Sequence, residues 1–217
     1  MSRGKLFRFE QNRLAPNVIE QGKTFFDRAK GNWRSDYFKN QNPLIVELAC
    51  GKGEYTVGLA RRHPDVNYIG VDKKGDRIAR GSQTAITEQL SNVVFLRTDI
   101  RLIDEFFEPE EVDEIWITFP DPQPRQEKAR LTYADYLAKY HQILKPNGRL
   151  HLKTDSTDFF DFSVDTLGNG GFEIVQLTSN LYASDLWMRH FGIKTRYEEI
   201  FADKGFLIKY LECKKVS

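Results

Sequence analysis

The sequence is poor in the residues that cross-link chains, ligate metals or span membranes. It holds 2 cysteines, Cys50 and Cys213, and with no secretory segment these are expected to stay reduced. Its 4 histidines show no ligand spacing, so no metal site is predicted. No apolar run is long enough to cross a bilayer, and none precedes a small-residue cleavage site. We therefore expect a cytoplasmic protein that uses neither a membrane nor a metal.

Net charge is nearly absent as well. The formal charge is +1, so a surface for nucleic acid would have to be local. Residues 1–34 carry 8 lysines and arginines but 3 acidic residues. This bias indicates either a solvated terminus or a phosphate-binding arm. We therefore predict a basic N-terminal extension over residues 1–40 and one α/β domain over residues 41–217.

Apolar runs alternate with helical periodicity from about residue 44 onward. Seven strands are predicted, at residues 44–49, 67–72, 93–97, 114–118, 149–155, 172–177 and 205–212. Helical spacing covers residues 55–62, 78–90, 132–144 and 159–167. The alternation predicts an α/β fold with a mostly parallel sheet. The last two strands lack a helical crossover, so one strand near the C-terminus is expected to run antiparallel.

Acidic residues stand at or just after the ends of the predicted strands. They are Glu47, Asp72, Asp99, Asp121 and Asp155. The carboxyl ends of parallel strands share one edge of a sheet, where ligands of open α/β sheets bind. Asp99 or Asp155 taken alone is more commonly a helix cap or a loop residue. Together, the five acids predict a site at that edge.

The stretch Val46-Glu-Leu-Ala-Cys-Gly-Lys-Gly53 leads from a strand into glycines. Gly51 and Gly53 allow the backbone to approach a ligand that a Cβ atom would repel. A nicotinamide fingerprint would place a third glycine where Glu54-Tyr55 stands. An acid-rich rim also suits a cation better than a pyrophosphate. The pattern therefore favours S-adenosylmethionine, which carries a sulfonium and an α-ammonium group.

Each acid of the first three strands has an expected partner on this cofactor. Glu47 would orient the methionine end through its ammonium group. Asp72 would hold the ribose hydroxyls, and Asp99 would accept from the adenine amino group.

With these residues placed, the chain resembles the bacterial tRNA (guanine-N7-)-methyltransferase family over residues 44–212. The elements that carry the resemblance are Val46-Glu-Leu-Ala-Cys-Gly-Lys-Gly53, Gly70-Val-Asp72, Phe119-Pro-Asp-Pro122, Lys153-Thr-Asp155 and Thr195-Arg-Tyr-Glu198. The resemblance implies a Rossmann-like class I methyltransferase fold. It also implies methyl transfer to N7 of the variable-loop guanine at tRNA position 46.

Guanine N7 has an available lone pair at neutral pH, so its methylation does not require a general base to remove a proton first. Orientation should dominate, and Asp121 is the predicted catalytic residue, also close to the cofactor. Its carboxylate could accept from guanine N1–H and the exocyclic amine as positive charge moves onto the ring. The flanking prolines restrict its backbone, although a structural turn with a capping Asp has the same pattern.

Further roles concern the RNA. The resemblance implies substrate contacts by Arg125, Asp155, Thr195, Arg196, Tyr197 and Glu198. Lys128 and Arg130 are candidate phosphate contacts, because binding to the RNA backbone needs cations but little sequence information.

The chain departs from the family pattern in the segment after Asp121. Gln123 and Arg125 replace a tryptophan and a lysine, and residues 126–130 are shorter and less basic than in the family. Two alternatives therefore stay open. One is a methyltransferase for another RNA or a small molecule, and the other is a catalytically silent RNA-binding subunit.

Overall fold

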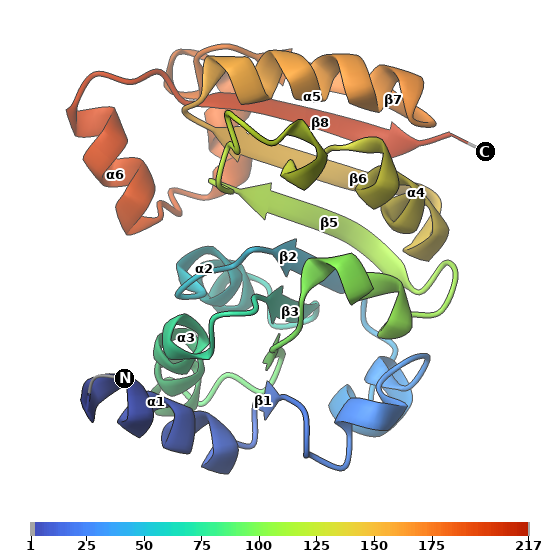
Figure 1. Cartoon of the computed structure of the whole chain (residues 1–217), viewed down its shortest axis with the longest axis vertical. Coiled ribbons are helices and arrows are strands. Elements are labelled where there is room, and N and C mark those ends of the chain that lie inside the picture. The colour runs from blue at the N-terminus through green and yellow to red at the C-terminus, as the bar shows by residue number, and fades with distance from the viewer. Residues whose placement is uncertain (1–2, 217) are drawn as a thin grey trace. The chain divides into compact units, whose positions relative to one another are not determined.

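The computed structural model describes residues 3–216, so residues 1–2 and 217 of the two predicted segments lie outside it. The chain divides into two compact units between Glu108 and Pro109. Each unit has its own strands and helices, shown in Figure 1.

The first unit consists of parallel strands with helical crossovers. Its elements are α1 (Arg3–Leu14), β1 (Val18–Ile19), β2 (Leu44–Leu48), α2 (Glu54–Arg62), β3 (Asn67–Val71), α3 (Gly75–Thr87) and β4 (Val93–Leu96). The strand order is β1-β4-β3-β2, and every described pair is parallel. Strands β2, β3 and β4 are buried along their whole length, which explains why they read as continuous apolar runs in the sequence.

The predicted N-terminal extension is folded onto this unit. Helix α1 packs on α3, and the Asn12 side chain donates to the carbonyl of Gly75 at 2.7 Å. Trp33 is buried and donates through Nε1 to the carbonyl of Phe106 at 2.8 Å. The Lys23 ammonium donates to the carbonyls of Asn12, Ala15 and Val18, at 2.8, 2.6 and 2.6 Å. At least one cation of this basic stretch therefore has a structural role.

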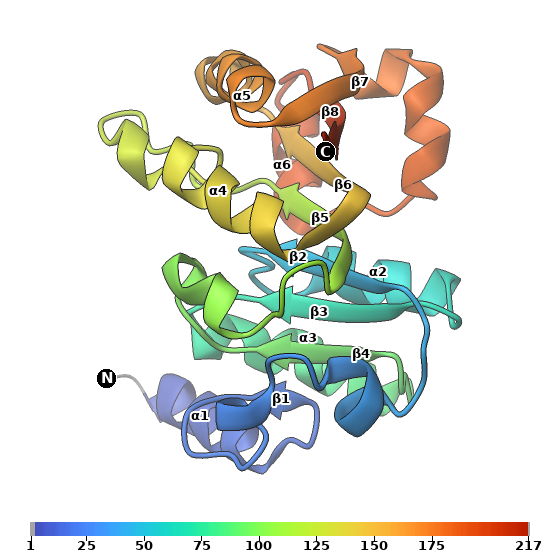
Figure 2. The ribbon, with the colours of Figure 1, turned by 90° about the vertical axis from the view of Figure 1, so that its right-hand side faces the viewer.

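The second unit contains the reversed strand. Its elements are β5 (Val112–Thr118), α4 (Ala134–Ile143), β6 (Leu144–Thr154), α5 (Thr157–Asn169), β7 (Phe172–Thr178), α6 (Arg196–Asp203) and β8 (Lys209–Lys215). The order is β5-β6-β8-β7, with β5 and β6 parallel and β8 antiparallel to both neighbours. Figure 2 shows α4 and α5 on one side of this sheet and the helical turns Leu181–Ala183 and Asp185–His190 on the other. The last two strands therefore pair antiparallel, as the sequence predicts.

The structure adds elements to those predicted. Strand β1 is an eighth strand among the described residues, and helices α1 and α6 lie in segments for which no helix was predicted. None of the helices in residues 3–216 has the length and apolar character needed to span a membrane.

Candidate active site

The loop after β2 contains the two glycines predicted to approach a cofactor, and both have left-handed backbone angles. Gly51 has φ 57°, and a Cβ atom there would meet nothing closer than 4.0 Å. Gly53 has φ 69°, and a Cβ atom there would lie 2.4 Å from the Phe95 ring. Gly53 is therefore needed for packing inside the unit. Gly51 is the position that borders open space for a ligand.

Glu47, near the end of β2, is 3% exposed and bound to the first turn of α2. Its Oε2 accepts from the backbone N–H of Thr56 at 2.8 Å and also from the Thr56 hydroxyl. A carboxylate at this place complements the positive end of the helix. The helix thereby holds the Glu47 side chain in one orientation.

Asp72 follows β3 and binds backbone on both sides. Its Oδ2 accepts from the N–H of Gly51 at 3.0 Å, and its Oδ1 accepts from the N–H of Lys74 at 2.8 Å. Burial raises the pKa of the nearby Cys50 thiol, and the negative charges of Glu47 and Asp72 raise this pKa further. The two acids thus gather around the glycine loop. This fixed acidic rim beside the open side of Gly51 fits a ligand with a sulfonium and an ammonium group.

Asp99 follows β4 and is the N-cap of the 3-10 segment Ile100–Glu105. Its carboxylate accepts from the Arg101 backbone at 3.1 Å and from the Arg101 guanidinium at 3.0 and 2.7 Å. The side-chain hydrogen bond from Arg101 is the largest cause that lowers the pKa of Asp99. The capping role weighed for Asp99 from the sequence is therefore present.

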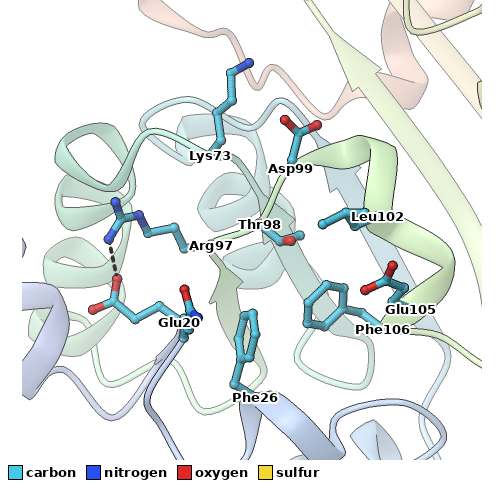
Figure 3. A pocket seen from close by; sticks show the side chains of 10 residues that line it. Glu20, Phe26, Lys73, Arg97, Thr98, Asp99, Leu102, Glu105 and Phe106 are labelled. Atoms are coloured by element: carbon cyan, nitrogen blue, oxygen red, sulfur yellow. Dashed lines mark hydrogen bonds and ion pairs between the residues drawn. The ribbon is translucent and has the colours of Figure 1, made fainter.

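A pocket of about 530 Å³ lies beside Asp99 in the first unit, as Figure 3 shows. Its lining is formed by Glu20, Gln21, Phe26, Lys73, Arg97, Thr98, Asp99, Leu102, Glu105 and Phe106. Asp99 and Lys73 stand at its rim, and the ion pair between Arg97 and Glu20, at 2.8 Å, borders it on the other side. Neither Glu47 nor Asp72 is among the described residues that line it.

In the second unit, the loop after β5 holds Asp121. The carboxylate of Asp121 is exposed, and its Oδ1 accepts from the N–H of Gln123 at 3.1 Å. Phe119 and Gln123 both have left-handed backbone angles, with φ 48° and 47°. Such angles cost non-glycine residues about 1–2 kcal/mol each. Local strain of this kind clusters at functional sites, and it is consistent with a loop that presents Asp121.

The Thr195-Arg-Tyr-Glu198 segment begins helix α6 with a capping box. The Thr195 hydroxyl accepts from the N–H of Glu198, and the Glu198 carboxylate accepts from the N–H of Thr195, at 3.1 and 3.3 Å. Glu198 also pairs with Lys153 of β6, with Nζ 2.8 and 2.9 Å from the two carboxylate oxygens. The Tyr182 hydroxyl donates to the same carboxylate at 2.7 Å. Lys153 and Glu198 both have fully buried side chains.

In this structure Thr195 and Glu198 bind other residues of the unit, and the substrate contacts that the resemblance implied for them stay predictions. Both side chains are occupied inside the unit, where their hydrogen bonds attach α6 to β6. Arg196 and Tyr197, the two residues between them, are exposed. Thr195 and Glu198 thus fix the start of α6, and Arg196 and Tyr197 between them face solvent.

Tyr197 lies near Asp121 and Asp155, the two acids that the sequence predicts for the site in this unit. Burial raises the pKa of the Tyr197 hydroxyl, and the negative charges of Asp155 and Asp121 raise it further. The ring of Phe119 has its centroid 5.8 Å from that of Tyr197. The structure therefore brings Asp121, Asp155 and Tyr197 together at the ends of β5 and β6.

The predicted phosphate contacts differ in accessibility. Arg125 and Lys128 are exposed, but Arg130 is 2% exposed. The Arg130 guanidinium pairs with Asp158 and lies 4.6 Å from the centre of the Phe162 ring. Arg130 is thus held by Asp158 in the interior of the unit, and its contact with a phosphate stays a prediction.

Sequence reasoning missed Lys153 and Tyr182 as partners of the site. A lysine within the buried strand β6 was the available signal, because a buried lysine requires a counter-charge. Among the described residues, no group of three or more His, Cys, Asp or Glu side chains could hold a metal ion.

Comparison with known proteins adds a family to this geometry. Residues 41–210 match a family described as putative methyltransferase. The chain is 42% identical to a tRNA (guanine-N(7)-)-methyltransferase of Bacteroides fragilis, over 98% of this chain and 86% of the relative. It is 43% identical to the protein of the same name in Christiangramia forsetii, over 98% of both chains.

Solved structures show the same fold at low sequence identity. A 16S rRNA methyltransferase, KamB, has a TM-score of 0.68 at 12% identity and covers 93% of this chain and 99% of its own. The antibiotic-resistance methyltransferase Kmr has a TM-score of 0.65 at 17% identity, with 92% and 98% covered. These likenesses confirm the Rossmann-like methyltransferase fold that the sequence predicts.

Proposed function

Since the chain belongs to the tRNA (guanine-N(7)-)-methyltransferase family, we propose that it transfers a methyl group from S-adenosylmethionine to N7 of guanine in tRNA. The identity of about 42% across 98% of the chain carries this proposal. Within it, the target is the variable-loop guanine at position 46, and cytoplasmic tRNA is the substrate pool.

The acidic rim of the first unit would hold the methyl donor. Glu47 would bind the α-ammonium group and Asp72 the ribose, with the open side of Gly51 leaving room for the ligand. Asp99, at the rim of the pocket, would accept from the adenine amino group. When bound, S-adenosylmethionine supplies a methyl group on a positively charged sulfur.

Asp121 would bind the guanine through N1–H and the exocyclic amine. N7 carries its own lone pair, so the residues of the chain need not remove a proton from the base. Orientation alone can contribute about 7–11 kcal/mol in favourable cases. A fixed carboxylate also stabilises the positive charge that develops on the ring. The hydrogen bond from Gln123 to Asp121 supports a fixed carboxylate.

The remaining exposed residues would contact the RNA. We assign Asp155, Arg196 and Tyr197 to the target nucleotide, since Tyr197 lies close to Asp121 and Asp155. Arg125 and Lys128 would bind phosphates, because both are exposed cations in the segment after Asp121.

One assay tests the function. Purified protein is incubated with labelled S-adenosylmethionine and unmodified tRNA transcripts, and the methylated nucleotide is located by mass analysis. We expect 7-methylguanosine at the variable loop, and no label in a transcript that lacks this guanine. Methylation at another site would favour a different RNA substrate. RNA binding without binding of S-adenosylmethionine would instead indicate a catalytically silent subunit.

A further inference from the structure

A row of aromatic rings leads from the Asp121 loop along helix α6. The ring of Phe119 lies 5.8 Å from that of Tyr197, measured between centroids. Tyr197 stacks on Phe201 at 4.4 Å with an interplanar angle of 23°. Phe201 meets the edge of Phe206 at 5.4 Å and 62°. Four rings therefore form a continuous series that begins two residues before Asp121.

The outer part of this row is open to solvent. Tyr197 is 47% exposed, Phe206 is 49% exposed and the neighbouring Leu207 is 52% exposed. Single exposed apolar residues are ordinary, but a contiguous group of them marks a binding surface. We call Tyr197, Phe201, Phe206 and Leu207 the aromatic ladder.

A cation lies on this side of α6, at Lys204, whereas the acids Asp121 and Asp155 lie near Tyr197. Residues three, four and seven apart share one face of a helix, so Lys204 lies on the same face as Tyr197 and Phe201. The Lys204 ammonium is 5.1 Å from the centre of the Phe201 ring. Glu199 and Asp203 fall on the other side of the helix by the same periodicity. The aromatic ladder thus combines flat apolar surface with a cation, which suits an anionic ligand with aromatic groups.

We propose that the aromatic ladder stacks an unpaired base next to the target guanine of the RNA substrate. The proposal rests on the proposed function and names a second contact surface for the same substrate. Guanine N7 faces the major groove, which is deep and narrow in an RNA helix and closed to side chains. A target presented for methylation must therefore leave regular stacking, and its neighbour loses a stacking partner. Aromatic side chains beside a cation replace such a partner in proteins that bind single strands.

Binding of unmodified tRNA transcript, followed by fluorescence anisotropy, tests this role with Phe206→Ala. We expect the Kd to rise between about 5-fold and 150-fold, the range for loss of one base–aromatic stack. Phe206→Tyr keeps a ring and should retain the wild-type Kd. Leu177→Ala removes a similarly exposed apolar side chain from β7, 51% exposed in the native chain, and should also leave the Kd unchanged. Melting temperatures of all three variants exclude an effect on folding.

A transcript with abasic nucleotides on both sides of the target guanine tests the stacking itself. Wild-type protein should bind this RNA more weakly than intact transcript, and Phe206→Ala should cause no further loss. Equal binding of intact transcript by wild type and Phe206→Ala would overturn the proposal. A change in oligomeric mass of Phe206→Ala at unchanged RNA affinity would also overturn it, because the surface would then join protein copies.

Failure of the proposed function has a separate signature. If the wild-type protein forms no 7-methylguanosine, the assigned activity is wrong whatever the Kd of the variant. If 7-methylguanosine forms, Phe206→Ala should raise the KM for tRNA by the same factor as the Kd while kcat stays close to wild type. A fall in kcat alone would contradict a stacking role.

Discussion

The buried ion pair between Lys153 and Glu198 makes Glu198→Gln a costly substitution in spite of its small change in shape. Both side chains are fully buried, and the Glu198 carboxylate also accepts from the Tyr182 hydroxyl and the Thr195 N–H. The substitution removes the Glu198 charge that pairs with the buried Lys153 ammonium. Breaking a buried pair from one side costs about 3–5 kcal/mol. We expect the free energy of unfolding to fall by about that amount.

The free energy of unfolding is measured by urea titration at neutral pH. Glu199→Gln is the matched control, because Glu199 is the exposed neighbour on the same helix, and its cost should stay within about 0.5 kcal/mol. The double variant Lys153→Met with Glu198→Gln removes both charges. It should be more stable than the sum of the two single losses predicts, since paired residues are not additive.

The KM for tRNA gives a second measure of how the Lys153–Glu198 ion pair contributes to the site. If Glu198 only positions α6, Glu198→Gln should raise the KM for tRNA, and the double variant should recover part of this loss because α6 regains its place. A loss below about 1 kcal/mol for Glu198→Gln, or strict additivity in the double variant, would refute the reasoning from burial.

Three other outcomes follow from the site and its surroundings. Asp121→Ala should lower kcat strongly while binding of S-adenosylmethionine, measured by calorimetry, is largely kept, and wild-type methylation kinetics would reject its role. Both glycines have positive φ, so alanine is strained at either position, but Gly53→Ala should lower the melting temperature more, because a Cβ atom there would also lie 2.4 Å from Phe95. Gly51→Ala avoids this clash and should also weaken cofactor binding. An equal melting temperature for the two variants would contradict this contrast. Burial, with smaller effects from Lys153 and His151, lowers the pKa of His190 from 6.5 to about 2. The unfolded chain therefore binds a proton that the folded chain does not between these values, and stability should fall as pH drops below about 6.5, by about 2 kcal/mol at pH 5. In urea titrations at pH 7 and pH 5, His190→Asn should lose less stability over this range than the wild-type protein, and an identical loss would argue against the assignment.

Most strands could be predicted from the sequence because their signal is local. Strands β2 to β8 correspond to the seven predicted apolar runs. The predicted reversal near the C-terminus is confirmed, although its premise was wrong, because helix α6 lies between β7 and β8. Strand β1 escaped prediction because it has two residues, Val18 and Ile19, and depends on pairing with the distant β4. The position of β8 between β6 and β7 was likewise a matter of long-range pairing.

The residues of the candidate site also differ in whether a local sequence signal or a long-range contact determines their role. Residue type and spacing were enough to identify the acids Glu47 and Asp72, whose charges the structure gathers around the glycine loop. The Thr-x-x-Glu spacing of Thr195 and Glu198 was a visible capping signal, although the resemblance favoured substrate contacts. The other partners of Glu198, Lys153 and Tyr182, lie 45 and 16 residues away in the sequence.

Residue chemistry and periodicity are local properties of the chain, so sequence alone was sufficient for the seven longer strands, the positions of the acidic residues and the family. Burial depends on which distant segments pack together. The fold therefore decided that Arg130 and Glu198 serve the interior, that Gly53 makes room for Phe95, and that Tyr197 faces solvent. A side chain of given chemistry can bind a substrate only where packing leaves it exposed, and no local pattern carries that information.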